Sequence, residues 1–250
     1  MDKWIGKVAV VTGASFGIGE AICRKLVKNG MIVVGFARKE YRLQELKNEL
    51  NDNFHYVKVD LCSEKNILDA FGWVKSTFKS IDVLINNAGV LKLTDVLGDT
   101  NDWKLMFDTN VLGLHICCRE AIKIMKENEI KEGHIINVNS ITGHYIMSGM
   151  KDFSVYGSTK FSVTALTEYL REFMSMENLP IRVTSISPGF VDTKMTAKFN
   201  LDKVEDNATL QTIDIADAML YALSAPKRVN VAEITLRPSI DNMAHIVNSS

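Results

Sequence analysis

Short runs of β-branched residues alternate along the chain with longer segments in which apolar residues recur at helical spacing. The short runs are almost continuously apolar, which is typical of strands covered on both faces, as in a parallel sheet. They predict seven strands, at Lys7–Thr12, Met31–Phe36, Phe54–Val59, Ile81–Ile85, His134–Val138, Ile181–Ile186 and Glu233–Leu236.

Helical periodicity is clearest in three segments between these strands. It predicts helices over Ile18–Asn29, Trp103–Lys126 and Ser154–Met176. The β–α–β order implies right-handed crossovers and helices on both faces of the sheet. We therefore predict one α/β domain over residues 1–250, a single-domain Rossmann fold with a doubly wound, seven-stranded parallel sheet.

The composition fits such a domain and narrows its functions. Of 250 residues, 46% are hydrophobic, and 29 Lys and Arg residues balance 30 Asp and Glu residues. This balance argues against a nucleic-acid binder that relies on a basic field. No apolar run reaches the roughly 18 residues that span a bilayer, and no basic region followed by an apolar stretch opens the chain. We expect a cytoplasmic protein with neither membrane nor nucleic acid as a partner.

The cysteines predict neither a disulfide framework nor a metal site. Cys117 and Cys118 are adjacent, and neither they nor Cys23 and Cys62 form a CxxC pair. Zinc and redox motifs depend on such spacings. We expect buried thiols in a reducing compartment.

A glycine-rich turn joins the first predicted strand to the first predicted helix. It reads TGASFGIG and carries Gly13, Gly17 and Gly19. Glycines let the chain turn sharply and let phosphate oxygens approach peptide N–H groups at the positive end of a helix. Some glycine turns only change the chain direction, but the place between strand and helix indicates a dinucleotide site. The intervening Ser15, Phe16 and Ile18 belong to the same predicted site.

The residues after the second predicted strand indicate which dinucleotide binds. NAD sites place a carboxylate there to hold the ribose hydroxyls, whereas this chain has Arg38 and Lys39. Two cations can clamp a 2′-phosphate, and arginine has the matching geometry. The alternative is a solvated helix start in which Glu40 pairs with either cation. We predict NADP(H) as the cofactor.

Tyr156 and Lys160 form the candidate catalytic pair. They are four residues apart, so both side chains project from one face if the segment is helical. A tyrosine with a pKa of about 10 is a poor acid–base catalyst at neutral pH. A neighbouring ammonium stabilises the phenolate and lowers that pKa. Helices also carry such pairs by chance, so this interpretation depends on other residues.

Polar and small residues at the ends of other predicted strands supply that support. Ser140 follows the fifth strand, where its hydroxyl can orient a carbonyl oxygen toward Tyr156. Asn110 lies within the apolar helix, where an amide needs a partner, and is either an ordinary buried residue or part of the site. The small residues Asn87, Ala88 and Gly89 follow the fourth strand and let a cofactor pass. Pro188, Gly189, Val191 and Thr193 follow the sixth strand and can hold a nicotinamide carboxamide.

These motifs together resemble the short-chain dehydrogenase/reductase family over essentially the whole chain. TGASFGIG, Asp60-Leu61, NNAG, Asn110, Ser140, YGSTK and PGFVDT occur in the family's order and spacing. The resemblance implies that Tyr156 is the general acid/base, that Lys160 activates it and that Ser140 orients the substrate. It also implies that Asn110 holds a water in a proton relay to Lys160. Asp60 would accept from the adenine amino group, next to Leu61, and Asn87 to Gly89 would border the adenosine ribose.

A narrower resemblance concerns animal cytosolic NADP(H)-dependent members, which include insect farnesol dehydrogenases and the vertebrate dehydrogenase/reductase member eleven. The opening MDKWIGKVAVVTGAS and the segment YGSTKFSVTALTEYLR carry it. It implies hydride transfer between NADP(H) and an alcohol or carbonyl on an apolar substrate, with farnesol-like alcohol oxidation expected first. A broad carbonyl or ketosteroid reductase is the second reading, and a non-catalytic NADPH sensor the third. Phe16 stands where many NADP-using relatives have a basic residue, so the phosphate contact rests more heavily on Arg38.

Two further expectations concern the surface. Residues 193–211 carry many charges and follow a strand end, which favours a substrate lid over a solvated loop. The loop Ile141–Val155 helps set the substrate pocket. The apolar surplus of Trp103–Lys126 and the likeness to family members predict a homodimer or homotetramer.

Overall fold

The protein folds around one parallel sheet. Its structure, a computed structural model, describes residues 1–197, 199 and 208–240. Seven strands pair in the order β3-β2-β1-β4-β5-β6-β7, every neighbouring pair parallel. They are β1 (Val8–Thr12), β2 (Ile32–Ala37), β3 (Phe54–Lys58), β4 (Val83–Asn86), β5 (Gly133–Val138), β6 (Ile181–Pro188) and β7 (Glu233–Leu236).

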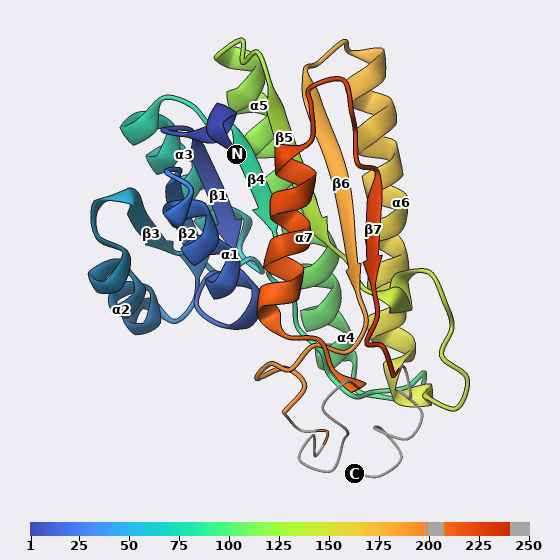
Figure 1. The fold of residues 1–250 in the computed structure, drawn as a ribbon. Helices are drawn as coiled ribbons and strands as arrows, with labels where there is room; N and C mark the ends of the chain where they lie inside the picture. Colours follow the sequence, from blue (N-terminus) through green and yellow to red (C-terminus); the bar gives the residue numbers. More distant parts are fainter. Residues whose placement is uncertain (198, 200–207, 241–250) are drawn as a thin grey trace.

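Helices cover both faces of this sheet (Figure 1). One face packs against α1 (Gly17–Lys28), α2 (Glu40–Leu50) and α7 (Thr212–Ser224). The other face packs against α3 (Glu64–Phe78), α5 (Leu114–Glu127) and α6 (Ser154–Met176), with α4 (Thr100–Phe107) beside α6. The predicted doubly wound Rossmann fold is confirmed.

Each strand divides its side chains between two buried cores, because successive residues of a strand point to opposite faces. In β1, Val8 and Val10 belong to the core under α3, α5 and α6. Ala9 and Val11 belong to the core under α1, α2 and α7. The chain moves outward in one direction from β1 to β3 and then restarts at β4 on the other side of β1. That switch leaves a crevice at the carboxyl ends of the strands, the usual ligand position in such folds.

All seven predicted strands are present, with small changes at their ends. The predicted helix over Ser154–Met176 is observed with those bounds. The helix predicted over Trp103–Lys126 is observed as one continuous helical stretch, within which a π-helical turn at Asp108–Gly113 separates α4 from α5. This wider turn holds Asn110, whose amide bonds to the backbone of Val90. Such turns inside helices are frequent at functional sites.

Three helices lie outside the ranges that the periodicity singled out. Ser63 caps α3 by accepting from the backbone N–H of Asn66, and a capping box formed by Gln211 and Asp214 begins α7. α2 is mostly polar and buries only Leu43 and Leu46. Among the described residues, no helix combines the length and apolar character needed to cross a membrane.

Candidate active site

A cavity of about 420 Å³ opens at the carboxyl edge of the sheet. Its walls come from the residues that follow β1 to β6 and from the first turns of α6. The predicted cofactor residues that line it are Gly13, Ser15, Phe16, Gly17, Ile18, Arg38, Lys39, Asp60, Leu61, Asn87, Ala88, Gly89, Tyr156, Lys160, Pro188, Gly189, Val191 and Thr193. Ser140 lines it as well, so segments far apart in the sequence meet in one space.

The glycine turn owes its shape to close backbone contacts. Gly13 and Gly17 have φ angles of 68° and 59°, a region that favours glycine. Gly19 is absent from the lining of the cavity, and its predicted place in the cofactor site stays a prediction. A Cβ there would lie 2.2 Å from the carbonyl oxygen of Gly13. Gly19 is therefore required for packing the turn against the helix.

The segment after β4 is fastened to the end of β1. The hydroxyl of Thr12 accepts from the backbone N–H groups of Asn87 and Ala88, at 3.1 and 3.0 Å. The side chain of Asn87 donates back to the carbonyl oxygens of Thr12 and Gly13, at 3.0 and 3.2 Å. These bonds fix the two strand ends that form the floor of the cavity.

The cavity presents backbone N–H groups and cations to a ligand. α1 begins at Gly17 and points its first N–H groups, which have no partner within the helix, toward the cavity. Arg38 and Lys39 are exposed at the end of β2. No carboxylate of the described residues pairs with either one, so the alternative in which Glu40 neutralises them is not observed.

Tyr156 and Lys160 lie in the first two turns of α6. The ammonium of Lys160 is 5.7 Å from the centre of the Tyr156 ring and donates to the carbonyl oxygen of Val138 at 2.9 Å. Only 5% of Lys160 is exposed. The helix therefore holds both side chains on the cavity side, as their spacing predicts.

The pKa values of the pair differ from the sequence expectation. The hydroxyl of Tyr156 lies deep among protein atoms, and this burial raises its pKa, while a hydrogen bond with Ser140 acts in the lowering direction. Burial also lowers the pKa of Lys160 to about 8. The pKa of Tyr156 is thus raised in the protein alone, where the sequence predicted a lowered value, because desolvation is the largest cause of its shift.

Ser140 lies two residues after the end of β5 and caps a short 3-10 turn at Ile141–Gly143. Its hydroxyl accepts from the backbone N–H and the hydroxyl of Thr142, at 3.2 and 3.0 Å. A serine hydroxyl can still donate when it accepts two bonds. Its contact with Tyr156 places two hydroxyl groups side by side at the cavity wall.

Asn110 stands behind the cavity wall and has partners on three sides. Its Oδ1 accepts from the backbone N–H of Val90 at 2.8 Å. Its Nδ2 donates to the carbonyl oxygen of Val90 at 2.9 Å and to the hydroxyl of Thr159 at 3.1 Å. Asn110 thus has the hydrogen-bond partners that a buried amide needs. It joins the segment after β4 to α6.

Aromatic side chains form the far wall of the cavity. Phe199 stacks on Phe153 with ring centres 5.8 Å apart and contacts Phe190 edge-on at 5.4 Å. Tyr156 packs beside this group, and Leu91 belongs to it. This wall beside the Tyr156 hydroxyl suits an apolar ligand.

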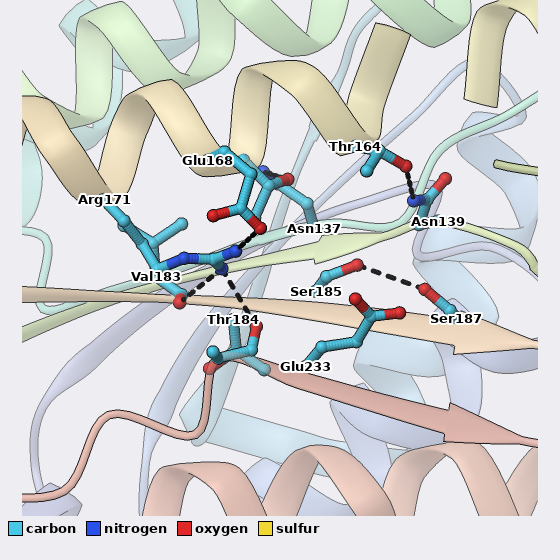
Figure 2. A network of polar contacts seen from close by, with 12 residues as sticks. Asn137, Asn139, Thr164, Glu168, Arg171, Val183, Thr184, Ser185, Ser187 and Glu233 are labelled. Atoms are coloured by element: carbon cyan, nitrogen blue, oxygen red, sulfur yellow. Dashed lines mark hydrogen bonds and ion pairs between the residues drawn. The ribbon is translucent and has the colours of Figure 1, made fainter. Parts of the chain in front are cut away.

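A polar network that sequence reasoning missed lies behind the Ser140 turn. Nε2 of His144 is 2.9 Å from Oε1 of Glu233 on β7 and 3.0 Å from the hydroxyl of Ser187 on β6. Asn139 donates to the hydroxyl of Thr164 on α6 at 2.8 Å. Figure 2 shows the Asn139–Thr164 and Ser185–Ser187 pairs with Glu233 next to them. No local motif marks His144, because its partners are distant in the sequence.

The segment after β6 reaches the cavity from the other side. Val191 pairs with Leu210 in an isolated bridge, and the backbone N–H of Thr193 donates to the hydroxyl of Thr196. Lys194 and Met195, which belong to the expected lid, line the cavity. Within the expected lid, 193–211, residues 198 and 200–207 lie outside the described residues.

Among the described residues, no group of three or more His, Cys, Asp and Glu side chains is placed so that it could hold a metal ion. The four cysteines form no disulfide. Cys23, Cys117 and Cys118 are buried as expected, whereas Cys62 is exposed, a correction to the expectation of four buried thiols. Cys62 contacts the hydroxyl of Thr109 at 3.3 Å.

Comparison with known proteins agrees with this geometry. The model of the short chain dehydrogenase family matches residues 7–204. A farnesol dehydrogenase of Aedes aegypti is 43% identical over 244 residues, which cover 95% of this chain and 98% of that protein. The human dehydrogenase/reductase SDR family member 11 is 40% identical over 253 residues, which cover 96% of each chain.

Solved structures share the fold and hold dinucleotides of both kinds. A serine dehydrogenase complexed with NADP⁺ superimposes with a TM-score of 0.84 at 31% identity, covering 92% of this chain and 94% of that one. An alcohol dehydrogenase of Thermococcus sibiricus complexed with 5-hydroxy-NADP gives 0.83 at 28% identity, covering 94% and 98%. A 3-ketoacyl-(acyl-carrier-protein) reductase of Brucella melitensis complexed with NADH gives 0.84 at 26% identity, covering 94% and 98%.

Proposed function

The chain belongs to the short-chain dehydrogenase/reductase family, and from that premise we propose an NADP(H)-dependent oxidoreductase acting on an alcohol or carbonyl of an apolar substrate. One observation carries the proposal. The hydroxyls of Ser140 and Tyr156 and the ammonium of Lys160 meet in the cavity that also contains the glycine turn. Arg38 and Lys39 line the same cavity and pair with no carboxylate among the described residues. A proton donor, a carbonyl-orienting hydroxyl and a phosphate cradle are what hydride exchange with a carbonyl requires.

The residues present fit the nicotinamide dinucleotide. The turn between Gly13 and Gly17 would hold the pyrophosphate, Asp60 the adenine and Arg38 the 2′-phosphate. Pro188 to Thr193 would border the nicotinamide, which supplies or accepts the hydride when bound. We infer a preference for NADP(H) because Arg38 and Lys39, rather than a carboxylate that would bind free ribose hydroxyls, come immediately after β2.

Tyr156 and Ser140 would handle the substrate oxygen. Ser140 donates to this oxygen and orients it, and Tyr156 gives it a proton in reduction or takes one in oxidation. Lys160, held by Val138, supplies positive charge beside Tyr156, which favours the phenolate whenever the proton leaves. Asn110 fixes the turn before α5 against Thr159, next to Lys160, and so supports the route by which the proton is replaced.

The substrate we favour is a farnesol-like isoprenoid alcohol. Three phenylalanines, Phe153, Phe190 and Phe199, form a continuous apolar wall beside Tyr156 and leave its hydroxyl as the polar end of the pocket. An elongated apolar alcohol matches this arrangement. Stacked rings also suit a planar ketosteroid, which makes a carbonyl reductase the second candidate.

The decisive assay measures the absorbance of the reduced nicotinamide at 340 nm, with the reaction run in both directions. Purified protein is given NADP⁺ with farnesol, and NADPH with a ketosteroid and simple carbonyls, each repeated with the non-phosphorylated cofactor. We expect the highest kcat/KM with farnesol and NADP⁺. Steroid turnover above farnesol would select the second candidate. Cofactor binding without any turnover would instead identify a sensor.

The setting of the enzyme is part of the same proposal. The chain would act as one domain, with residues 193–211 as its substrate lid, in the cytoplasm, where four unbridged cysteines remain reduced. It would form a homodimer or homotetramer through α4 and α6, whose exposed apolar side chains include Phe107, Phe161, Tyr169, Phe173 and Met176. Light scattering of the purified protein measures the assembly, and a monomer would contradict it.

A further inference from the structure

Three cations surround the ring of Phe16 at the mouth of the cavity. The ammonium of Lys194 lies 3.7 Å from the ring centre, that of Lys39 5.0 Å, and the guanidinium of Arg42 4.9 Å. They come from different parts of the chain: Lys39 from the loop after β2, Arg42 from α2, and Lys194 from the segment after β6. Aromatic faces attract cations. The Phe16 ring therefore holds three cations beside the glycine turn, although the turn itself has no basic side chain.

The charges at this place are unbalanced. Arg42 is paired, with Glu20 at 3.5 Å and with Glu45. Lys39 and Lys194 have no carboxylate within ion-pair distance among the residues that the structure describes. Cations held close together repel one another unless an anion joins them. The arrangement therefore suits a multiply charged anion better than it suits the protein alone.

The position of the group selects the anion. Phe16, Lys39 and Lys194 all line the cavity, together with Arg38. Phe16 is the residue immediately before α1, and Lys39 immediately precedes α2. In this fold the adenosine ribose lies between those two helix starts. A phosphate on that ribose would meet Arg38 and Lys39 from one side and Lys194 from the other.

We propose that Lys194 is a specificity-determining residue that completes the 2′-phosphate site from the segment after β6, with Phe16 as its platform. This proposal rests on the proposed function. It adds a physical link between the two ends of the site, because the neighbouring Met195 and Phe199 form part of the substrate wall. Binding of the 2′-phosphate then also fixes Met195, the neighbour of Lys194, at the wall of the substrate pocket.

Cofactor affinity provides the first test, measured by quenching of protein fluorescence without any turnover. Replacing Lys194 with Met should weaken NADPH binding roughly tenfold or more and leave NADH binding unchanged, since only one cofactor carries the 2′-phosphate. Lys194→Arg should restore most of the affinity. Lys28→Met is the matched control, an exposed lysine at the opposite end of α1, and should change neither constant.

Two outcomes would overturn the inference. If Lys194→Met weakens the binding of NADPH and NADH equally, Lys194 contacts the pyrophosphate rather than the 2′-phosphate. If the variant binds NADPH as tightly as the wild type, Lys194 does not contact the cofactor. A wild-type protein that binds both cofactors equally well would refute the NADP(H) preference itself, which keeps the two failures apart. The coupling is tested separately: with NADPH, Lys194→Met should raise the KM for substrate, whereas with NADH the variant and the wild type should have the same KM.

Discussion

The ammonium of Lys160 donates to the carbonyl oxygen of Val138 and lies 5.7 Å from the centre of the Tyr156 ring. The lysine is thus fixed by the end of β5 rather than by the phenol. Its charge remains next to the tyrosine, while its position depends on β5, the strand that ends two residues before Ser140. The catalytic geometry is set by one strand end and one helix start, both of which are rigid elements.

Tyr156→Phe removes the proposed proton donor and should leave NADPH binding intact while lowering kcat by at least about a hundredfold. In the wild type, the raised pKa of Tyr156 predicts that alcohol oxidation and carbonyl reduction depend differently on pH. Oxidation needs the phenolate and should accelerate as pH rises, whereas reduction needs the neutral phenol and should stay level through neutral pH. Steady-state rates in both directions measure this. An oxidation rate independent of pH, or an active phenylalanine variant, would contradict the assignment.

Lys160→Met should abolish activity and yet stabilise the protein at neutral pH. Burial lowers the pKa of Lys160 from 10.5 to about 8, so the folded protein at pH 7 holds a charge that is better solvated in the unfolded chain. This cost is present below pH 8 and is relieved as pH rises from 8 toward 10.5, where the unfolded state binds more protons. We expect a gain of about 1–3 kcal/mol at pH 7 that shrinks above pH 9. Urea unfolding at both pH values measures it, and a loss of stability at pH 7 would refute the reasoning.

Glu233→Gln should lower kcat more than it changes the KM for cofactor. Glu233 holds His144, which follows the Ser140 turn and also contacts Ser187 beside the nicotinamide border. Without the carboxylate, the Ser140 turn is less firmly placed, and we expect a loss of about tenfold in kcat. The matched control is Glu168→Gln, which removes the partner of Arg171 on the other side of the same network (Figure 2). Equal losses in both variants would indicate a general structural effect.

The central strands were predictable because each is buried on both faces and reads as an apolar run. β1 is buried throughout, and so are β4, β5 and β6. α2 gave little periodic signal, since it buries only Leu43 and Leu46 and is stabilised by packing on the sheet. The π-helical turn before α5 could not be predicted, because its amide partners lie at Val90 and Thr159, far from Asn110 in the sequence.

The candidate site was predictable to the extent that it depends on local motifs. The glycine turn, Ser140 and the Tyr156–Lys160 pair each have a fixed spacing within one segment, and they meet because parallel strands end at one edge. Lys194 and His144 have no such spacing, and their roles arise from contacts with Phe16 and Glu233. The direction of the Tyr156 pKa was mispredicted because spacing describes the nearby charge but not the depth of burial.

His134 should limit stability in acid, through contacts at the end of the sheet opposite the active site. It is fully buried on β5, its Nε2 lies 2.7 Å from the hydroxyl of Thr184, and Nδ1 has no hydrogen-bond partner. Burial lowers its pKa from 6.5 to about 3, with the charges of Arg182 and Lys3 acting in the same direction. The neutral imidazole therefore stabilises the fold above pH 6.5, and this contribution is lost as pH falls from 6.5 to 3.

His134→Gln keeps a side chain that can bond to Thr184 but cannot be protonated. Between pH 7 and pH 4, the unfolding free energy of this variant should therefore fall by a few kcal/mol less than that of the wild type. His115→Gln, at an exposed histidine on α5, serves as the control and should follow the wild type. Denaturant unfolding followed by circular dichroism at both pH values provides the measurement, and parallel losses in the His134 variant and the wild type would show that another group governs acid unfolding.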